Sequence, residues 1–388
     1  MPRPDYHGGS IVNLMSSITT HFGGSQVYPT LTTLPPEQLD EGDNVVLFII
    51  DGLGYSFLQD YGKDSILFQH LQGKMTSVFP STTAAAISTF YTGLAPQNHG
   101  IMGWFMWLKE LGLVSVILKS AIRLTKQNML LKSVSPNQIY STNSIFNRIQ
   151  ADGYVVLPRN LQSSPYNRSL GGKAVMRGHR NLKNFFTITL KILKKSQGKT
   201  FILCYWPNLD ATMHKYGVNS PQSLEEFLRI DEGFARFLKI VRNQHPTTKV
   251  IITADHGLID CPQEKTIWIK DHPPLQDSLS IPLCGESRAA FCYVHPSKVT
   301  QFESYVKEHL DYAFSFMPFE ELLLKEYFGL FQPHPRLLNR VGDYLLIAKE
   351  NYMLREDLLG EERETLLAHH GGVSEQEMHV PLITSFKQ

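Results

Sequence analysis

The sequence predicts an α/β protein built on a doubly wound, mostly parallel sheet that is covered by helices on both faces. Four short runs of apolar and β-branched residues are spaced along the chain, at 45–50, 154–157, 201–206 and 249–254. Uninterrupted runs of this length are typical of strands buried on both faces, as in a parallel sheet. Helical patterns lie between the runs, and strands that alternate with helices favour parallel βαβ units.

The clearest helical pattern covers residues 223–241. Its apolar residues fall broadly on one side: Leu224, Phe227, Leu228, Ile230, Phe234, Phe237, Leu238 and Val241. Residues 1–40 carry a shorter amphipathic helix and then loop-like sequence, and we expect them to form an N-terminal extension. Residues 104–140 and 260–350 fit the alternation poorly, so we expect insertions over the sheet, of the kind that build lids. No clean linker interrupts the chain, which predicts one domain over residues 1–388.

Composition excludes some classes of function. Of the 388 residues, 37 are basic and 36 acidic, giving a formal net charge of +1. This balance provides no bulk attraction to a nucleic acid polymer or to an anionic membrane, so any anion binding must be local. The longest apolar-looking stretch, 111–122, is too short for a membrane span and contains Lys119. The sequence predicts no particular oligomeric state.

The compartment is predicted from the N-terminus and from the cysteines. The first residues lack the basic-then-apolar pattern of a secretory signal, so we expect a cytoplasmic protein. The chain has four scattered cysteines, Cys204, Cys261, Cys284 and Cys292. Their spacing favours buried free thiols over a disulfide framework, although Cys284 and Cys292 are close enough in sequence to pair.

Acidic and imidazole side chains follow three of the four apolar runs. Asp51 comes directly after the first run, Asp210 and His214 shortly after the third, and Asp255 and His256 directly after the last. In open α/β sheets, sites form at the carboxyl ends of the strands. Because these ends meet at one edge of a parallel sheet, we expect the side chains to converge although they are far apart in sequence.

The spacing of these groups suits metal ions. Asp210 and His214 are four residues apart, which puts both on one face of a helix. His369-His370-Gly371-Gly372 offers a further imidazole beside flexible backbone. A set of three aspartates and three histidines suits two divalent ions, and mixed oxygen and nitrogen ligands favour Zn²⁺, with Mn²⁺ as the alternative. Two ions roughly 4 Å apart can clamp the attacking and leaving oxygens of a phosphoryl displacement.

A nucleophile candidate lies in the segment FPSTTAAA at 79–86. A proline followed by hydroxyl residues and alanines predicts a helix start. A hydroxyl there lies in the positive field of the helix terminus, near N–H groups that can bind a phosphate oxygen. A threonine needs a lowered pKa to attack at neutral pH, and coordination to a metal would provide it. The neighbouring hydroxyls of Ser81 and Thr82 are expected to be ordinary helix caps.

Five segments, taken in order, resemble a known family. They are VVLFIIDGLG, FPSTTAAAISTFYTGLAPQNHGI, YWPNLDATMHKYG, ITADHGL and HHGGVSEQEMHVPLI, and they span residues 45–385. Together they resemble the alkaline phosphatase superfamily, and more nearly its nucleotide pyrophosphatase/phosphodiesterase branch. The resemblance implies an alkaline phosphatase-like fold with lid insertions, and a small-molecule phosphate ester or nucleotide as substrate.

The resemblance also implies roles for individual residues. One ion would be held by Asp51, Asp255, His256 and the hydroxyl of Thr83, and the other by Asp210, His214 and His370. Thr83 would form a covalent phospho-threonine intermediate. The family places its nucleophile two residues after the hydroxyl residue of its F-P-[ST] motif, which selects Thr83 over Thr82. The family ligand directly precedes the glycine, which selects His370 over His369.

One departure from the family pattern leaves the substrate open. The branch often carries an asparagine soon after its His-Gly motif, but here His99-Gly100 leads to Trp104. A phosphomonoesterase or a phosphonate hydrolase on the same site is therefore an alternative, and a non-catalytic binding module is a more remote one. Sulfatases are disfavoured because their Cys/Ser-x-Pro-x-Arg motif is absent. Cofactor-independent phosphoglycerate mutases are disfavoured because their serine nucleophile lies in a different local sequence.

Five further residues are candidates for substrate contacts. The cations of Lys119, Arg123 and Arg159 could bind a distal phosphate. Trp104 could stack on a base or on a hydrophobic ester group. His272, in the segment KDHPPL, could reach the site. For each of them, an ordinary role in the surface or in packing is the simpler interpretation.

Overall fold

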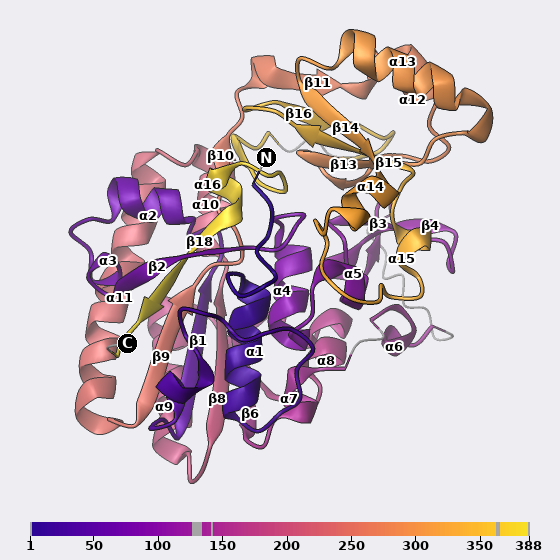
Figure 1. Cartoon of the computed structure of the whole chain (residues 1–388). Helices are drawn as coiled ribbons and strands as arrows, with labels where there is room; N and C mark the ends of the chain where they lie inside the picture. The colour runs from indigo at the N-terminus through magenta and orange to yellow at the C-terminus, as the bar shows by residue number, and fades with distance from the viewer. Residues whose placement is uncertain (1, 126–133, 141–142, 362–364, 387–388) are drawn as a thin grey trace.

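The computed structural model describes residues 2–125, 134–140, 143–361 and 365–386. Its main sheet has seven strands in the order β2-β18-β9-β1-β8-β6-β7. In chain order these are β1 Asn44–Ile50, β2 Leu71–Thr76, β6 Asp152–Pro158, β7 Val175–His179, β8 Thr200–Trp206, β9 Thr248–Thr253 and β18 His379–Thr384. Strands β9, β1, β8, β6 and β7 pair in parallel, and β18 pairs antiparallel with both β9 and β2. The predicted mostly parallel sheet is confirmed (Figure 1).

Helices cover both faces of this sheet. In the parallel register Val45 of β1 lies beside Phe201 of β8, so Phe48, three residues on, points to the opposite face. The Phe201 ring contacts Phe22 and Phe146, whereas Phe48 contacts the rings of Phe185, Phe186, Phe234 and Phe237 at centroid distances of 4.9–5.9 Å. One face therefore packs against α1 and α7, and the other against α9 and α11. This is the predicted doubly wound arrangement.

The helices have the following bounds. On the side of α1 lie α1 Ile11–His21, α4 Thr83–Thr92, α7 Ile145–Arg148 and α8 Pro165–Gly171, and the other side carries α3 Ile66–Gln69, α9 Leu182–Lys195, α10 Asn208–Tyr216 and α11 Pro221–Gln244. The remaining helices are α2 Tyr55–Tyr61, α5 Pro96–His99, α6 Pro136–Ile139, α12 Pro273–Asp277, α13 Val299–His309, α14 Phe319–Leu324, α15 Leu337–Arg340 and α16 Glu375–Met378.

A second sheet, with seven strands that all pair antiparallel, has the order β14-β15-β13-β12-β3-β4-β5. Its strands are β3 Phe105–Leu108, β4 Leu113–Val116, β5 Ala121–Ile122, β12 Cys284–Glu286, β13 Ala289–Cys292, β14 Phe314–Pro318 and β15 Tyr344–Ala348. The two stretches expected as insertions thus supply one sheet between them, at the upper right of Figure 1. Residues 126–133 of the first stretch lie outside the described residues, and a single domain over 1–388 stays a prediction.

Two short ribbons lie beside these sheets. Strand β10, Ile259–Asp260, pairs antiparallel with β17, Ala368–His369, and β11, Thr266–Trp268, pairs parallel with β16, Met353–Arg355. The β10–β17 ribbon matters most for function, because it carries the first residue of the predicted His369-His370 pair. It also follows β9 closely, and so holds this pair near the carboxyl end of that strand.

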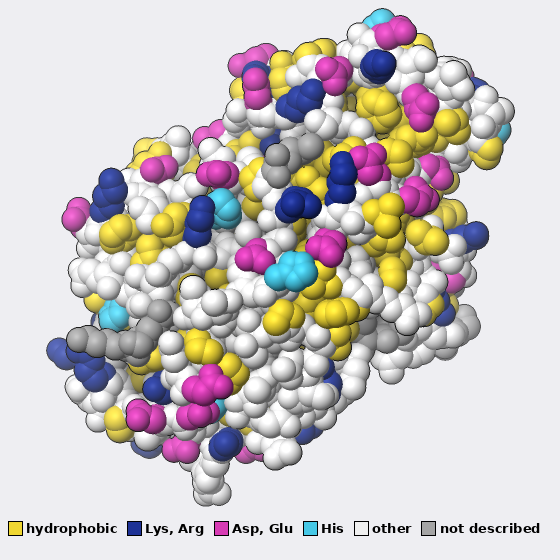
Figure 2. Space-filling view, in the orientation of Figure 1, with side chains coloured by type: hydrophobic (Ala, Val, Ile, Leu, Met, Phe, Trp, Pro, Cys, Tyr) yellow, Lys and Arg dark blue, Asp and Glu magenta, His cyan; other side chains and the backbone are white. Residues whose placement is uncertain are grey.

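The surface charges and the state of the cysteines match what the composition predicts. Figure 2 shows charged side chains of both signs scattered over one face, with hydrophobic side chains between them. All four cysteines are buried and free, as predicted. Among the residues that the structure describes, no helix combines the length and the apolar character needed to cross a bilayer.

Candidate metal and nucleophile site

Three aspartates meet at one edge of the main sheet, where the adjacent strands β9, β1 and β8 end. Asp51 follows β1, and its N–H donates to the Trp206 carbonyl of β8 at 2.9 Å. The Asp210 N–H in turn donates to the Asp51 carbonyl at 3.1 Å. Asp255 follows β9, and its carboxylate accepts from the N–H of Gly52 at 3.2 Å. The strand ends therefore bring the acids together, as expected from their positions in the sequence.

Three histidines surround these aspartates. The Nε2 atom of His214 lies 3.3 Å from the Asp210 carboxylate one turn earlier in α10. The Nε2 atom of His370 lies 4.0 Å from the same Asp210 oxygen. The His256 Nε2 lies 3.5 Å from Asp51 and 3.4 Å from Asp255. The rings of His256 and His370 stack with centroids 3.8 Å apart, so that all six side chains share one neighbourhood.

The histidines share one orientation. In each of them Nδ1 lies within hydrogen-bonding distance of a backbone carbonyl: 2.7 Å for His214 and Ala368, 3.2 Å for His256 and Gly257, and 3.2 Å for His370 and Ser81. A carbonyl can only accept, so Nδ1 carries the proton and the lone pair is left on Nε2. Metal-binding histidines are oriented in this way, with the second nitrogen held by a carbonyl or a carboxylate.

The carboxylates also present free oxygen atoms. Asp51 accepts from the Tyr205 hydroxyl with one oxygen, and Asp255 accepts from the N–H groups of Gly52 and His256 with one oxygen. The buried Oδ1 atoms of Asp51 and Asp210 and the Oδ2 atom of Asp255 have no hydrogen-bond partner among the described residues. A buried acceptor without a partner is costly, and a bound cation would satisfy it.

The pKa shifts of the site residues also favour a bound cation. Burial, followed by repulsion from Asp255 and Asp210, raises the pKa of Asp51 well above its usual value. Burial also raises the pKa of Asp210. Burial, followed by the neighbouring His256 and His214, lowers the pKa of His370 well below its usual value. Without a cation the site thus disfavours charged carboxylates, and it keeps His370 neutral and able to act as a ligand.

The donor atoms form two overlapping groups. Ligand atoms of Asp51, Asp255 and His256 all lie within 4.8 Å of one another, and so do those of Asp210, His256 and His370. The first group contains three of the residues expected for one ion. The second contains two of those expected for the other ion, and His214 adjoins it through Asp210. Three imidazole nitrogens and three free carboxylate oxygens fit divalent cations that accept mixed nitrogen and oxygen ligands.

Thr83 borders these groups. It is the first residue of α4, and its Oγ1 lies 3.1 Å from the Nε2 of His256. The expectation that Thr82 and Ser81 are ordinary caps is wrong. Thr82 occupies the N-cap position, but its hydroxyl donates to Glu286 at 2.6 Å, and the Ser81 hydroxyl donates to the Gly372 carbonyl at 2.7 Å. Both hydroxyls tie the start of α4 to distant segments.

The sequence reasoning missed two residues that touch this site. The hydroxyl of Tyr205 in β8 donates to Asp51. A tyrosine within a buried apolar strand needs a partner for its hydroxyl, and this could have indicated the contact from the sequence. Glu286 accepts from the Thr82 hydroxyl and from the Trp104 N–H, the latter at 2.7 Å. Burial raises the pKa of Glu286 to about 7. No local pattern marks Glu286, because pairing within the second sheet brings it here.

The candidate substrate contacts fall into two classes. Trp104 lies near the site, because its N–H donates to Glu286. The Lys119 ammonium lies 5.3 Å from the centre of the Trp104 ring. Arg159 is exposed and follows β6, at the same edge of the main sheet. Roles in substrate binding stay predictions for these three residues.

The other two candidates have contacts within the protein, and their roles in substrate binding also stay predictions. Arg123 is buried, and its guanidinium donates to the Glu361 carboxylate at 2.7 Å and to the Leu283 carbonyl at 2.9 Å. These bonds connect it to two other segments of the chain. His272 contacts the Tyr305 hydroxyl at 2.9 Å where α12 begins. The α12–α13 layer lies on the far side of the second sheet from the main sheet (Figure 1).

The raised pKa of Asp51 predicts a pH effect on stability. In metal-free protein, the stability that Asp51 contributes through its raised pKa is complete below its usual pKa of 3.8. This stability is lost as pH rises through the raised pKa. Asp51→Asn cannot ionise, so with a chelator present the variant should become more stable than wild type as pH rises from 4.5 to 8. Each unit by which the pKa is raised corresponds to about 1.4 kcal/mol of folding free energy. Thermal unfolding of both proteins checks this, and a wild type that gains stability over the variant with rising pH would contradict it.

Comparisons with known proteins identify the family of the chain. The family model for type I phosphodiesterase / nucleotide pyrophosphatase matches residues 45–372. The bis(5'-adenosyl)-triphosphatase ENPP4 of Pongo abelii is 24% identical over 269 residues, covering 66% of this chain and 54% of that protein. Ectonucleotide pyrophosphatase/phosphodiesterase family member 3 of Rattus norvegicus is 24% identical over 262 residues, covering 62% and 27%. The chain thus spans about half, or less, of the length of these curated relatives.

Solved structures share the fold. Human ENPP5 superposes with a TM-score of 0.66 at 17% identity, covering 88% of this chain and 87% of that chain. Phosphonoacetate hydrolase from Sinorhizobium meliloti 1021, in complex with phosphonoformate, gives a TM-score of 0.65 at 17% identity, covering 88% and 89%. The family model covers most of the chain, including all the residues of the metal and nucleophile site. The chain therefore belongs to the type I phosphodiesterase/nucleotide pyrophosphatase family.

Proposed function

We propose that the chain is a two-metal hydrolase of phosphodiesters or nucleotide pyrophosphates that acts through a phospho-threonine at Thr83. The observation that carries this proposal is the arrangement of the donors. Three imidazoles, fixed by backbone carbonyls, present Nε2 toward three carboxylates that each keep a free buried oxygen. The hydroxyl of Thr83 lies 3.1 Å from one of these imidazoles.

The chain's own residues would divide the two ions between them. Asp51, Asp255, His256 and Thr83 would hold one ion, and Asp210, His214 and His370 the other. Bound there, divalent ions would supply positive charge opposite the phosphate oxygens and would lower the pKa of the threonine hydroxyl. Zn²⁺ suits this mixture of ligands best, with Mn²⁺ as the alternative.

The chemistry has two displacements. The Thr83 hydroxyl gives up its proton, and its oxygen attacks phosphorus. A bond from Thr83 Oγ1 to phosphorus forms while the bond to the leaving oxygen breaks, and the leaving group takes up a proton. Water then attacks the phosphorus of the phospho-threonine. Its oxygen bonds to phosphorus, the bond from Thr83 Oγ1 to phosphorus breaks, and Thr83 takes up a proton to restore its hydroxyl. Because Thr83 starts α4, the first-turn N–H groups and the helix dipole favour the negative phosphate at this position.

A preference for diesters is favoured by the charges at the site. A monoester carries more negative charge than a diester and needs a nearby cation to balance it. Within the part of the chain that the structure describes, only histidines form ion pairs with Asp51, Asp210 and Asp255. Glu286 adds a carboxyl group beside Thr82, and the charge of Asp210 contributes to raising its pKa. A further carboxyl next to the nucleophile opposes a dianion more strongly than a monoanion.

The names of the relatives support a nucleotide substrate. ENPP4 is named as a bis(5'-adenosyl)-triphosphatase, and a structure of murine ENPP5 in complex with AMP is described as inactive through a threonine-to-alanine substitution. In this chain Trp104, with Lys119 over its ring, could provide a face for a base and a charge for a distal phosphate. A phosphonate hydrolase remains an alternative, because phosphonoacetate hydrolase shares the fold.

The test compares two esters of one leaving group. With Zn²⁺ or Mn²⁺ present, bis(p-nitrophenyl) phosphate should be hydrolysed with a kcat/KM about tenfold or more above that of p-nitrophenyl phosphate, a difference of about 1.4 kcal/mol. The Glu286→Gln variant removes the opposing charge and should narrow this ratio by improving the monoester reaction. A faster monoester reaction in the wild type would favour a phosphomonoesterase. No hydrolysis of diesters, phosphonates or dinucleotides would favour the non-catalytic alternative.

A further inference from the structure

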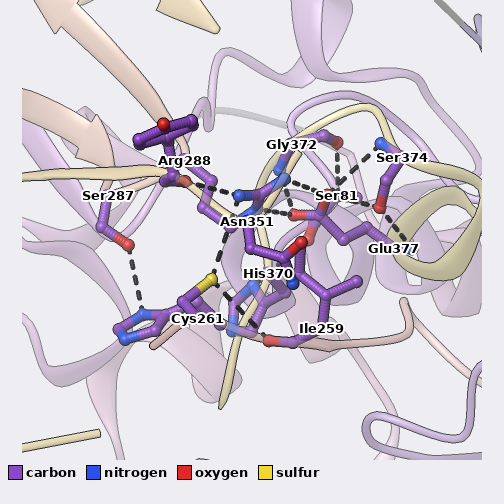
Figure 3. Close-up of polar contacts among 12 residues, drawn as sticks. Ser81, Ile259, Cys261, Ser287, Arg288, Asn351, His370, Gly372, Ser374 and Glu377 are labelled. Atoms are coloured by element: carbon purple, nitrogen blue, oxygen red, sulfur yellow. Dashed lines mark hydrogen bonds and ion pairs between the residues drawn. The ribbon is translucent and has the colours of Figure 1, made fainter. Parts of the chain in front are cut away.

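The β12–β13 turn, Glu286-Ser287-Arg288, reaches from the second sheet to the metal site. Each of its three side chains contacts a different segment. Glu286 accepts from the Thr82 hydroxyl at 2.6 Å. The Ser287 hydroxyl lies 3.2 Å from the Nδ1 of His369, next to His370. Arg288 pairs with Glu377 in α16 (Figure 3). One turn of the second sheet therefore touches both the start of α4 and the segment that carries His370.

The Arg288–Glu377 pair is closed off from solvent. The two side chains are 1% and 0% exposed. The guanidinium meets the carboxylate through two bonds, Nε to Oε1 at 2.7 Å and Nη2 to Oε2 at 2.9 Å. Its other N–H groups donate to the backbone carbonyls of Glu350 and Tyr352. The Arg288 side chain is therefore fully engaged within the protein and is not a substrate contact.

Glu377 connects the two histidine segments. Its carboxylate accepts from the N–H of Gly372 at 2.8 Å, two residues after His370. Its backbone carbonyl accepts from the N–H of Gly257 at 2.9 Å, directly after His256. The fit is close, because a Cβ on Gly257 would lie 2.0 Å from the Gln376 carbonyl oxygen. Glu377, the partner of Arg288, thus binds the backbone close to both of the histidines whose rings stack in the site.

A buried ion pair is by itself weak evidence of net stability. Removing two charges from water costs several kcal/mol per ion, and apolar residues of similar volume are often equally stable. Its clearest consequence here is geometric, because it sets where Gly257 and Gly372 lie relative to each other. Groups that orient metal ligands in this way typically change metal affinity by about 10–100-fold when they are lost.

We propose that Arg288 and Glu377 are positioning residues, which hold His256 and His370 at the separation that the two ions require. That these histidines bind metal rests on the proposed function. That the ion pair fixes their segments does not, and it can be measured in metal-free protein. The second sheet would then be a structural part of the site as well as a cover over it.

The test uses the double variant Arg288→Met/Glu377→Met, which removes both charges and keeps similar volume. In metal-free protein, hydrogen exchange of peptides covering 369–372 should be about tenfold faster than in wild type, while peptides from β1 keep their rates. Zn²⁺ affinity, measured by competition with a chromophoric chelator, should fall about 10–100-fold. Lys298→Met, which removes the exposed ion pair with Asp277 at the surface of the second sheet, is the matched control and should change neither.

Two outcomes would overturn the proposal. One is wild-type exchange at 369–372 together with wild-type Zn²⁺ affinity. The other is an equal rise in exchange over all peptides, which would mean that the pair serves general stability only. If the double variant does not fold, Arg288→Lys should show the same selective change at smaller size, and a uniform change there also counts against positioning. Full diester hydrolysis by a Thr83→Ala variant would instead overturn the proposed function and leave the exchange result valid.

Discussion

Replacing Thr83 with alanine is expected to lower kcat for a phosphodiester by about 10⁴-fold or more, with the fold unchanged. The hydroxyl oxygen forms the bond to phosphorus in the proposed mechanism, and it lies 3.1 Å from the Nε2 of His256. Steady-state kinetics on bis(p-nitrophenyl) phosphate measure the loss. Circular dichroism and elemental analysis of the same sample show whether anything else has changed.

Thr83→Ser is the matched control, because it restores a hydroxyl on a smaller side chain. It should recover most of the activity, and acid-quenched wild type should carry phosphate on the peptide that contains Thr83. A Thr83→Ala enzyme within about tenfold of wild type would contradict nucleophilic catalysis, since loss of a nucleophile costs far more than that. Phosphate found on Thr82 would move the nucleophile by one residue.

Removal of divalent metal is expected to abolish diester hydrolysis and to lower thermal stability. The three free carboxylate oxygens would be buried together without a cation, under the burial and the repulsion that raise the pKa of Asp51. A ligand that binds only the folded state at about 100 times its Kd stabilises it by about 2.7 kcal/mol. Dialysis against a chelator, followed by assays of activity and thermal unfolding, checks both effects.

Added Zn²⁺ or Mn²⁺ should restore activity and stability together, whereas Mg²⁺ suits the imidazole ligands poorly and should restore little. The Asp210→Asn variant lacks one charged ligand and should need a higher Zn²⁺ concentration for half-maximal recovery. Activity that survives exhaustive chelation would contradict the two-metal mechanism. Recovery with Mg²⁺ alone would contradict the assignment of Zn²⁺ or Mn²⁺ to these mixed nitrogen and oxygen ligands.

The sequence was a good guide to the main sheet and to the ligands for one physical reason. Buried parallel strands such as β1 need uninterrupted apolar residues, and their carboxyl ends must meet at one edge. Asp51 and Asp255 end two adjacent strands, so their convergence follows from the local pattern alone. The helical spacing of Asp210 and His214 likewise required only the pitch of a helix.

The contacts that surround the ligands could not be predicted in this way. Glu286 reaches Thr82 across 204 residues, and Arg123 reaches Glu361 across 238. Glu286 is placed by the pairing of the antiparallel second sheet, whose register no local periodicity specifies, and Glu361 lies outside the strands. The partners of Thr82 and Ser81, which are Glu286 and Gly372, are likewise distant in sequence, and this is why both hydroxyls were expected to be simple caps.

The central claim, that distant acids and imidazoles gather to hold a pair of cations beside Thr83, is tested most directly by counting the metal ions. Elemental analysis of gel-filtered protein loaded with Zn²⁺ should give about two ions per chain in the wild type. The Asp51→Asn and Asp210→Asn variants should each give about one, because each lacks a charged ligand from a different group. A wild type that retains no zinc, or variants that retain both ions, would contradict the account.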